Sequence, residues 1–171
     1  MKTIFRSSKR LLAALVLAVA ASTSHAAVMS DYLENKIIDW MIRGQSYTPP
    51  ATLYFGLTTS ACSDSATGTE VSGGSYARVG VTASLANFAG TQSAGSTTAS
   101  SGTGGTTSNN GAITFATPSA NWGQVTHVIV MDASTSGNLL FCIALTAMKN
   151  INNGDPAPSF AAAALSIQID N

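Results

Sequence analysis

Residues 124–145 read Gln-Val-Thr-His-Val-Ile-Val-Met-Asp-Ala-Ser-Thr-Ser-Gly-Asn-Leu-Leu-Phe-Cys-Ile-Ala-Leu and contain two runs of the residues that β-strands prefer. The first run is Gln124–Met131, and the second is Asn138–Leu145. Between them lies Asp132–Gly137, whose small and polar residues are typical of a hairpin loop. This stretch therefore predicts two neighbouring antiparallel strands.

Similar short runs occur on both sides of this hairpin. The aromatic and β-branched segment Thr52–Thr59 predicts a strand, and apolar residues alternate toward the end of the segment 160–169. Two weaker runs are residues 76–85 and 112–116. Six or seven short, closely spaced strands are typical of a mainly β fold, so we predict an antiparallel β-sandwich or barrel.

One α-helix is predicted ahead of the strands, over residues 31–43. Ser30 and Asp31 can cap the free N–H groups at its start, and Gly44 is a natural stop. Four apolar residues of the helix share one face: Leu33, Ile37, Trp40 and Met41. This face is broad enough to need cover from the same domain or from another subunit, so these four residues are candidate assembly contacts.

The segment Ala89–Gly111, AGTQSAGSTTASSGTGGTTSNNG, has no charged, aromatic or branched aliphatic residue. Such a composition cannot bury enough apolar area to offset the entropy of ordering the chain. We therefore predict a flexible surface loop. Two interpretations stay open, a tolerated insertion and a loop that carries a glycan or contacts a partner.

The N-terminus has the pattern of a secretory signal peptide. Four basic residues in the first ten positions precede the apolar run Leu11–Ala21 and the polar segment Ser22–Ala26. A run of about 11 residues is shorter than the roughly 20 that a membrane-spanning helix needs. We predict a signal peptide over residues 1–26, a single domain over 27–171, and a secreted protein with no membrane span after cleavage.

The predicted mature chain is poor in charge. Its 145 residues carry four basic and eight acidic side chains, a net charge of −4. Such a chain has no basic footprint for nucleic acid. Low charge also weakens the self-repulsion that keeps proteins apart, so we expect copies of the same chain as the partner.

Two cysteines and one histidine remain after the predicted cleavage, Cys62, Cys142 and His127. Export favours a Cys62–Cys142 disulfide, and the alternative is two separate thiols, one of them buried in a strand. The spacing is not Cys-x-x-Cys, so it does not indicate a redox-active pair. His127 is expected to be a packed or surface residue of its strand, and with two oxidised cysteines it cannot form a zinc site.

Other candidate sites are weaker. Trp122 can stack on a sugar, but a tryptophan beside a strand is more often a core residue. Asp64 and Glu70 share one loop, yet the order of a calcium-binding loop is absent. No nucleophile motif accompanies His127, and no glycine-rich phosphate loop is present. We therefore expect no cofactor, no metal and no enzymatic activity.

Five segments are more specific than composition alone: SDYLENK (30–36), RGQSYTPPATLYFGLTTS (43–60), GTEVSGGSYAR (68–78), NWGQVTH (121–127) and GNLLF (137–141). In this order they resemble a family of small tail-fibre-like or virion structural proteins of tailed bacteriophages. The resemblance extends over nearly all of the predicted mature chain, and GTEVSGGSYAR and NWGQVTH are its most specific parts. It implies a non-enzymatic, β-rich domain that works by assembly or surface contact, and it supplies no catalytic residues.

Three functional hypotheses follow from these observations. The main one is an exported structural subunit that polymerises into an extracellular filament or surface structure, because the export signal accompanies the virion-like segments. The second is a secreted adhesin or glycan-binding module that contacts a cell-surface glycan through Trp122. The third is a structural protein of a phage virion.

Overall fold

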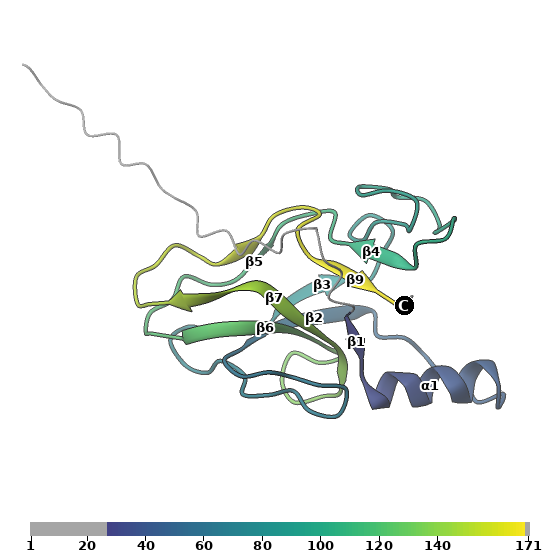
Figure 1. Ribbon diagram of the computed structural model, residues 1–171, viewed down its shortest axis with the longest axis horizontal. Coiled ribbons are helices and arrows are strands. Elements are labelled where there is room, and N and C mark those ends of the chain that lie inside the picture. Colours follow the sequence, from purple (N-terminus) through teal and green to yellow (C-terminus); the bar gives the residue numbers. More distant parts are fainter. Residues whose placement is uncertain (1–26, 170–171) are drawn as a thin grey trace, which may run out of the picture.

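The computed structural model describes residues 27–169, which form a mainly β structure with one helix (Figure 1). The elements in chain order are β1 (Val28–Met29), α1 (Asp31–Met41), β2 (Thr52–Thr58), β3 (Val79–Thr82), β4 (Thr106–Ser108), β5 (Ile113–Thr114), β6 (Gly123–Met131), β7 (Leu139–Ile151), β8 (Ser159–Phe160) and β9 (Ser166–Gln168). Among these described residues, no helix has the length and apolarity to cross a membrane. The predicted signal peptide, residues 1–26, lies outside the described part.

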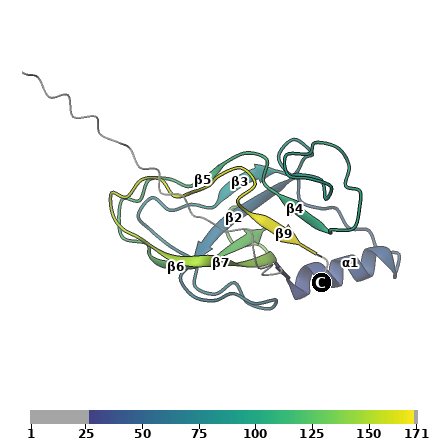
Figure 2. The ribbon, with the colours of Figure 1, turned by 45° about the horizontal axis from the view of Figure 1, so that its top comes forward.

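Five strands form the main sheet, in the order β1-β7-β6-β2-β3, and every neighbouring pair is antiparallel. The predicted hairpin of β6 and β7 lies inside this sheet. Two small antiparallel sheets, β4-β9 and β5-β8, lie on one side of the main sheet, as Figures 1 and 2 show. The prediction of a mainly β, antiparallel fold with one N-terminal helix is confirmed, but the strands do not close into a barrel.

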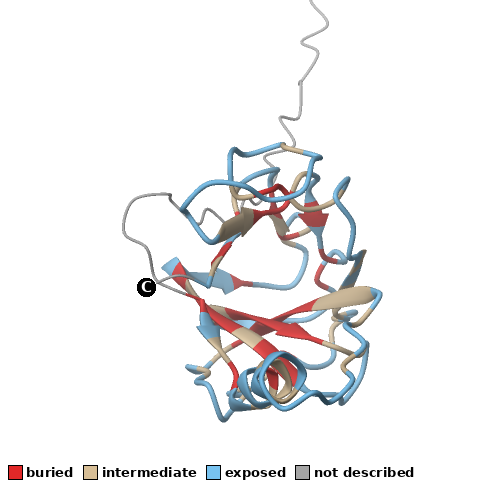
Figure 3. Ribbon diagram, turned by 90° about the vertical axis from the view of Figure 1, so that its right-hand side faces the viewer, coloured by how far each residue is buried: buried red, intermediate tan, exposed pale blue. Residues whose placement is uncertain are grey.

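The larger hydrophobic core lies between the main sheet and the small sheets (Figure 3). The β6–β7 ladder is irregular between Val125 and His127, because two steps along β6 there correspond to five steps along β7, from Lys149 to Ala144. Val125, Val128 and Val130 therefore all reach the larger core, although strict alternation would point Val125 away from it. A smaller cluster includes Ile129 and packs on the opposite face of the sheet.

The boundaries of several predicted elements need correction. The helix ends at Met41, two residues before the predicted end, and Gly44 follows with a φ of +70°. Strand β7 continues to Ile151, well beyond the predicted Leu145. The predicted final strand, 160–169, is divided into β8 and β9 by a turn. The turn includes Ala163, whose φ is +61°.

Part of the segment 89–111 is ordered by contacts that its composition does not indicate. Residues 106–108 form β4, so the prediction of a loop over the whole segment is wrong there. Asn109 is almost fully buried, and its side-chain amide group donates to the carbonyl oxygens of Gly111 and Ala161. Its side-chain oxygen accepts the N–H of Leu165 at 2.9 Å. These distant partners fix the end of the segment, and the flexibility of the remainder stays a prediction.

Candidate assembly surface

The start of α1 is fixed to the main sheet by Ser30. This side chain is buried, and its Oγ accepts the backbone N–H of Leu33 at 3.2 Å, which makes it the N-cap that the sequence predicts. The same hydroxyl donates to the carbonyl of Leu139, and the Ser30 N–H donates to the carbonyl of Leu140 at 3.0 Å. The first turn of the helix is therefore attached to the start of β7.

The apolar face of α1 divides into a covered half and an exposed half. Leu33 is buried, and Ile37 packs against the larger core. Toward the end of the helix the large apolar side chains are exposed: Ile38 by 50%, Trp40 by 57%, Met41 by 65% and Ile42 by 78%. Of the four candidate assembly contacts, the structure leaves Trp40 and Met41 open to solvent, whereas Leu33 is largely used inside the protein.

A shallow apolar groove lies beside this exposed end. It has a volume of about 250 Å³ and is lined by α1, by the segment 47–50, and by residues of β2 and β7. Its wall includes Trp40, Tyr47 and Phe141. We call this groove, together with the exposed Met41 at the end of the helix, the α1 surface. Exposed apolar patches mark interaction sites on soluble proteins, which makes the α1 surface a candidate contact site.

The motif GTEVSGGSYAR holds two loops together through an ion pair. Arg78 makes a bidentate contact with Glu70, with Nε to Oε1 at 2.8 Å and Nη2 to Oε2 at 2.7 Å. Its Nη1 donates to the carbonyl oxygens of Ala133 and Ser136, in the loop between β6 and β7. Sequence reasoning missed this role of Arg78, because its partners in the hairpin loop are more than 50 residues away.

Tyr76 completes this network from inside the protein. Its hydroxyl donates to Glu70 Oε1 at 2.9 Å and accepts the backbone N–H of Leu57 at 2.8 Å. Burial raises the pKa of the Tyr76 hydroxyl well above its ordinary value, and the nearby Glu70 carboxylate adds to the rise. Glu70 is thus occupied by Arg78 and Tyr76, which argues against a role for it as a calcium ligand.

Trp122 is a core residue. It is 5% exposed, and its Nε1 donates to the carbonyl of Gly74 at 2.9 Å. Its ring packs edge to face against the ring of Tyr76, with the two ring centroids 5.3 Å apart. A side chain with its polar atom paired and its ring covered cannot stack on a glycan. The suggested ligand contact at Trp122 is therefore wrong, and the core interpretation of this residue holds.

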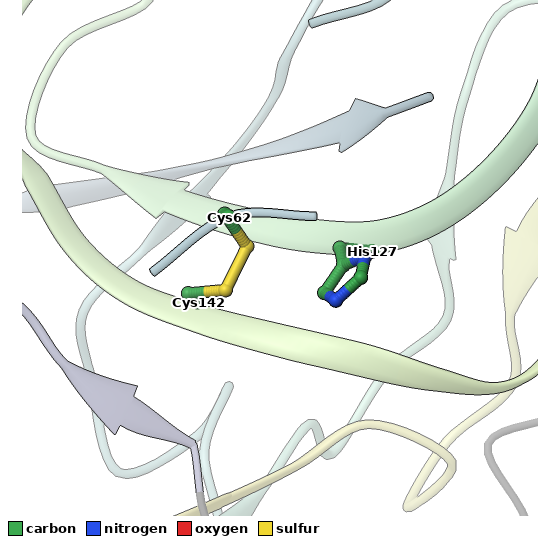
Figure 4. A group of neighbouring side chains, drawn as sticks. All are labelled: Cys62, His127 and Cys142. Carbon is green, nitrogen blue, oxygen red and sulfur yellow. A yellow bond between two sulfur atoms is a disulfide. The ribbon is translucent and has the colours of Figure 1, made fainter. Parts of the chain in front are cut away.

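The predicted Cys62–Cys142 disulfide is present, and His127 lies beside it (Figure 4). Cys142 is in β7 and His127 is in β6, whereas Cys62 comes from the loop after β2. The Sγ atoms of both cysteines and one ring nitrogen of His127 all lie within 4.8 Å of one another. Burial lowers the pKa of His127, and its Nδ1 is 2.8 Å from the Thr126 hydroxyl. The sequence could not show that all three side chains meet.

Comparison with known proteins supplies one family. The model of the family described as podophage GP4 fiber I protein gp80 matches residues 28–168, which is nearly all of the described part. No curated protein matches the chain.

Proposed function

Because this chain belongs to the podophage GP4 fiber I protein gp80 family, we propose that it is a structural subunit of a bacteriophage fibre. Membership of a fibre protein family implies a non-enzymatic, structural role in a phage. This agrees with the resemblance to tail-fibre-like proteins at the level of the sequence. It favours a protein of the virion over the exported filament that the N-terminal pattern suggests, and the match over residues 28–168 is the observation on which the proposal rests.

We further propose that the α1 surface is where one subunit meets a second copy of the same chain. A fibre is an assembly, and a contact between copies reuses one surface in every subunit. The exposed end of α1 offers Trp40 and Met41, side-chain types that are enriched at protein interfaces. The low charge of the chain reduces the repulsion that would oppose such a contact.

The oligomeric state of the purified full chain tests this contact. We expect oligomers in sedimentation velocity experiments, and we expect Met41→Ser to shift the population toward monomer. Met148→Ser is the matched control, because Met148 is 62% exposed but lies seven residues along β7 from Phe141, the last β7 residue that lines the groove. A wild-type chain that stays monomeric at high concentration would overturn the proposed contact, and so would equal effects of the two substitutions.

The place of the protein in the phage requires a separate experiment. Antibody labelling and mass spectrometry of purified phage particles should find the chain in a fibre. The exported alternative predicts the chain in filaments outside the cell, with Ala27 as its first residue after cleavage. Finding the chain only outside the cell, and never in particles, would overturn the virion proposal and support export.

A further inference from the structure

The cysteine pair and His127 form a cluster with the chemistry of a soft-metal site. Thiolate sulfur and imidazole nitrogen are the ligands that Zn²⁺ prefers, and a Cys2His set with one open position is known among zinc proteins. In the oxidised protein both sulfurs are occupied by the disulfide. The sequence-based argument against zinc therefore applies to this oxidised state and leaves the reduced state open.

We propose that the reduced protein binds one Zn²⁺ ion through Cys62, Cys142 and His127. Zn–S bonds of about 2.3 Å and a Zn–N bond of about 2.0 Å, at tetrahedral angles, separate the ligand atoms by roughly 3.5–3.8 Å. All three ligand atoms already lie within 4.8 Å of one another. The Cα atoms of the cysteines are 5.8 Å apart, so rotation of the two side chains can open the sulfurs to this spacing.

The sheet holds two of the three ligands in place. His127 is paired with Ala144, and Ile129 is paired with Cys142, on the adjacent strands β6 and β7. Residues two apart in a strand, and residues directly opposite, project from the same face of a sheet. His127 and Cys142 therefore share one face, and Figure 4 shows the disulfide and the imidazole next to each other there.

The imidazole of His127 is already oriented by a hydrogen bond with the neighbouring Thr126. Its Nδ1 is 2.8 Å from the hydroxyl of Thr126, which leaves Nε2 to bind the ion. Ligating histidines commonly use their other nitrogen in this way, and such a contact fixes the tautomer and the ring orientation. Cys62 and His127 are both partly exposed, so an ion and a small thiol can reach the cluster from solvent.

Formation of the site is a balanced reaction. Two electrons and two protons from a thiol reductant, such as a dithiol, convert the disulfide to two thiols. Binding of Zn²⁺ then releases the two thiol protons and forms two Zn–S bonds. The loop that carries Cys62 would be held to β7 by the ion in a reducing compartment and by the disulfide in an oxidising one.

Cobalt titration of the full chain tests the site directly. After anaerobic reduction with a phosphine, we expect one Co²⁺ per chain, with thiolate charge-transfer bands and the visible bands of a tetrahedral site, which Zn²⁺ then displaces. The oxidised chain should show neither the charge-transfer bands nor the visible bands of tetrahedral Co²⁺. His127→Gln should weaken binding at least tenfold, whereas Lys149→Gln is the control and should leave binding unchanged, because Lys149 is an exposed residue of β7 outside the cluster.

Circular dichroism and thermal melts accompany the titration. Zn²⁺ should raise the melting temperature of the reduced wild type and leave that of the oxidised chain unchanged. A reduced chain that shows no thiolate-to-cobalt bands would overturn the proposal. Equal affinity and equal spectra for wild type and His127→Gln would also overturn it, because the ion would then be held by the thiols alone. The outcome does not depend on whether the protein is a phage fibre.

Discussion

Replacing Arg78 with methionine should destabilise the protein far more than the same change at Arg43. Methionine keeps much of the apolar length of the arginine side chain and removes its five N–H donors. At position 78 this leaves Glu70 with Tyr76 as its remaining side-chain partner, and it leaves the carbonyls of Ala133 and Ser136 without their donor. The expected cost therefore comes from lost polar contacts rather than lost volume.

The magnitude follows from the burial of this pair. The Arg78 side chain is 8% exposed and that of Glu70 is 25% exposed. Breaking a buried pair from one side costs about 3–5 kcal/mol, and because water reaches Glu70 we expect the lower end, about 3 kcal/mol. For a domain of this size, a loss of 3 kcal/mol lowers the melting temperature by roughly 10 °C.

Arg43 supplies the control, because it also pairs with a carboxylate, Asp39, at 3.2 Å. Its side chain is 69% exposed, and exposed pairs contribute less than about 1 kcal/mol. Urea denaturation gives the free energy of unfolding of each protein: wild type, Arg78→Met, Arg43→Met, and the double variant Arg78→Met with Glu70→Gln. The double variant should recover part of the loss, because the unpaired charge is gone. If Arg78→Met costs no more than Arg43→Met, the structural role assigned to the motif is wrong.

Three further predictions use the same denaturation assay. Ser30→Ala should cost about 1–2 kcal/mol, because it removes the helix cap and the hydrogen bond to Leu139; no loss would contradict this anchoring role. Stability should be retained below about pH 10 and fall above it, because the unfolded state releases the Tyr76 proton there while burial keeps it bound in the folded state; an unchanged slope in Tyr76→Phe would refute this cause. Leu33→Ala should cost about 2–3 kcal/mol and Trp40→Ala less than about 1 kcal/mol, because only Leu33 is covered; equal costs would contradict the division of the helix face.

Several features of the fold could be predicted from the sequence, because residue types and short-range patterns determine them. The hairpin of β6 and β7 follows from two β-rich runs around a turn-rich segment, and the start of α1 follows from a serine that can cap it. The disulfide follows from an even cysteine count in an expected oxidising setting. The hairpin and the helix start depend on near neighbours along the chain, whereas the disulfide was predictable from the number of cysteines alone, although its two residues are 80 positions apart.

Features that depend on distant partners were not predictable in this way. The composition of 89–111 gives no sign that Asn109 will bond with Ala161 and Leu165. Periodicity placed four apolar residues on one face of α1, but which of them are covered depends on the segments that pack beside the helix. The meeting of His127 with the disulfide depends on the register of β6 against β7, which no local pattern contains.

The division of α1 also bears on how the protein would assemble. Ordering flexible groups at an interface opposes binding, so a contact surface is more effective when it is already held in place. Ser30 attaches the first turn of α1 to β7, and Leu33 packs into the core. The exposed end thereby lies about two turns beyond Leu33 and about three turns beyond Ser30. A rigid base that supports an exposed apolar end suits a contact repeated in every copy, and weakening the base should reduce assembly even though Ser30 itself is buried.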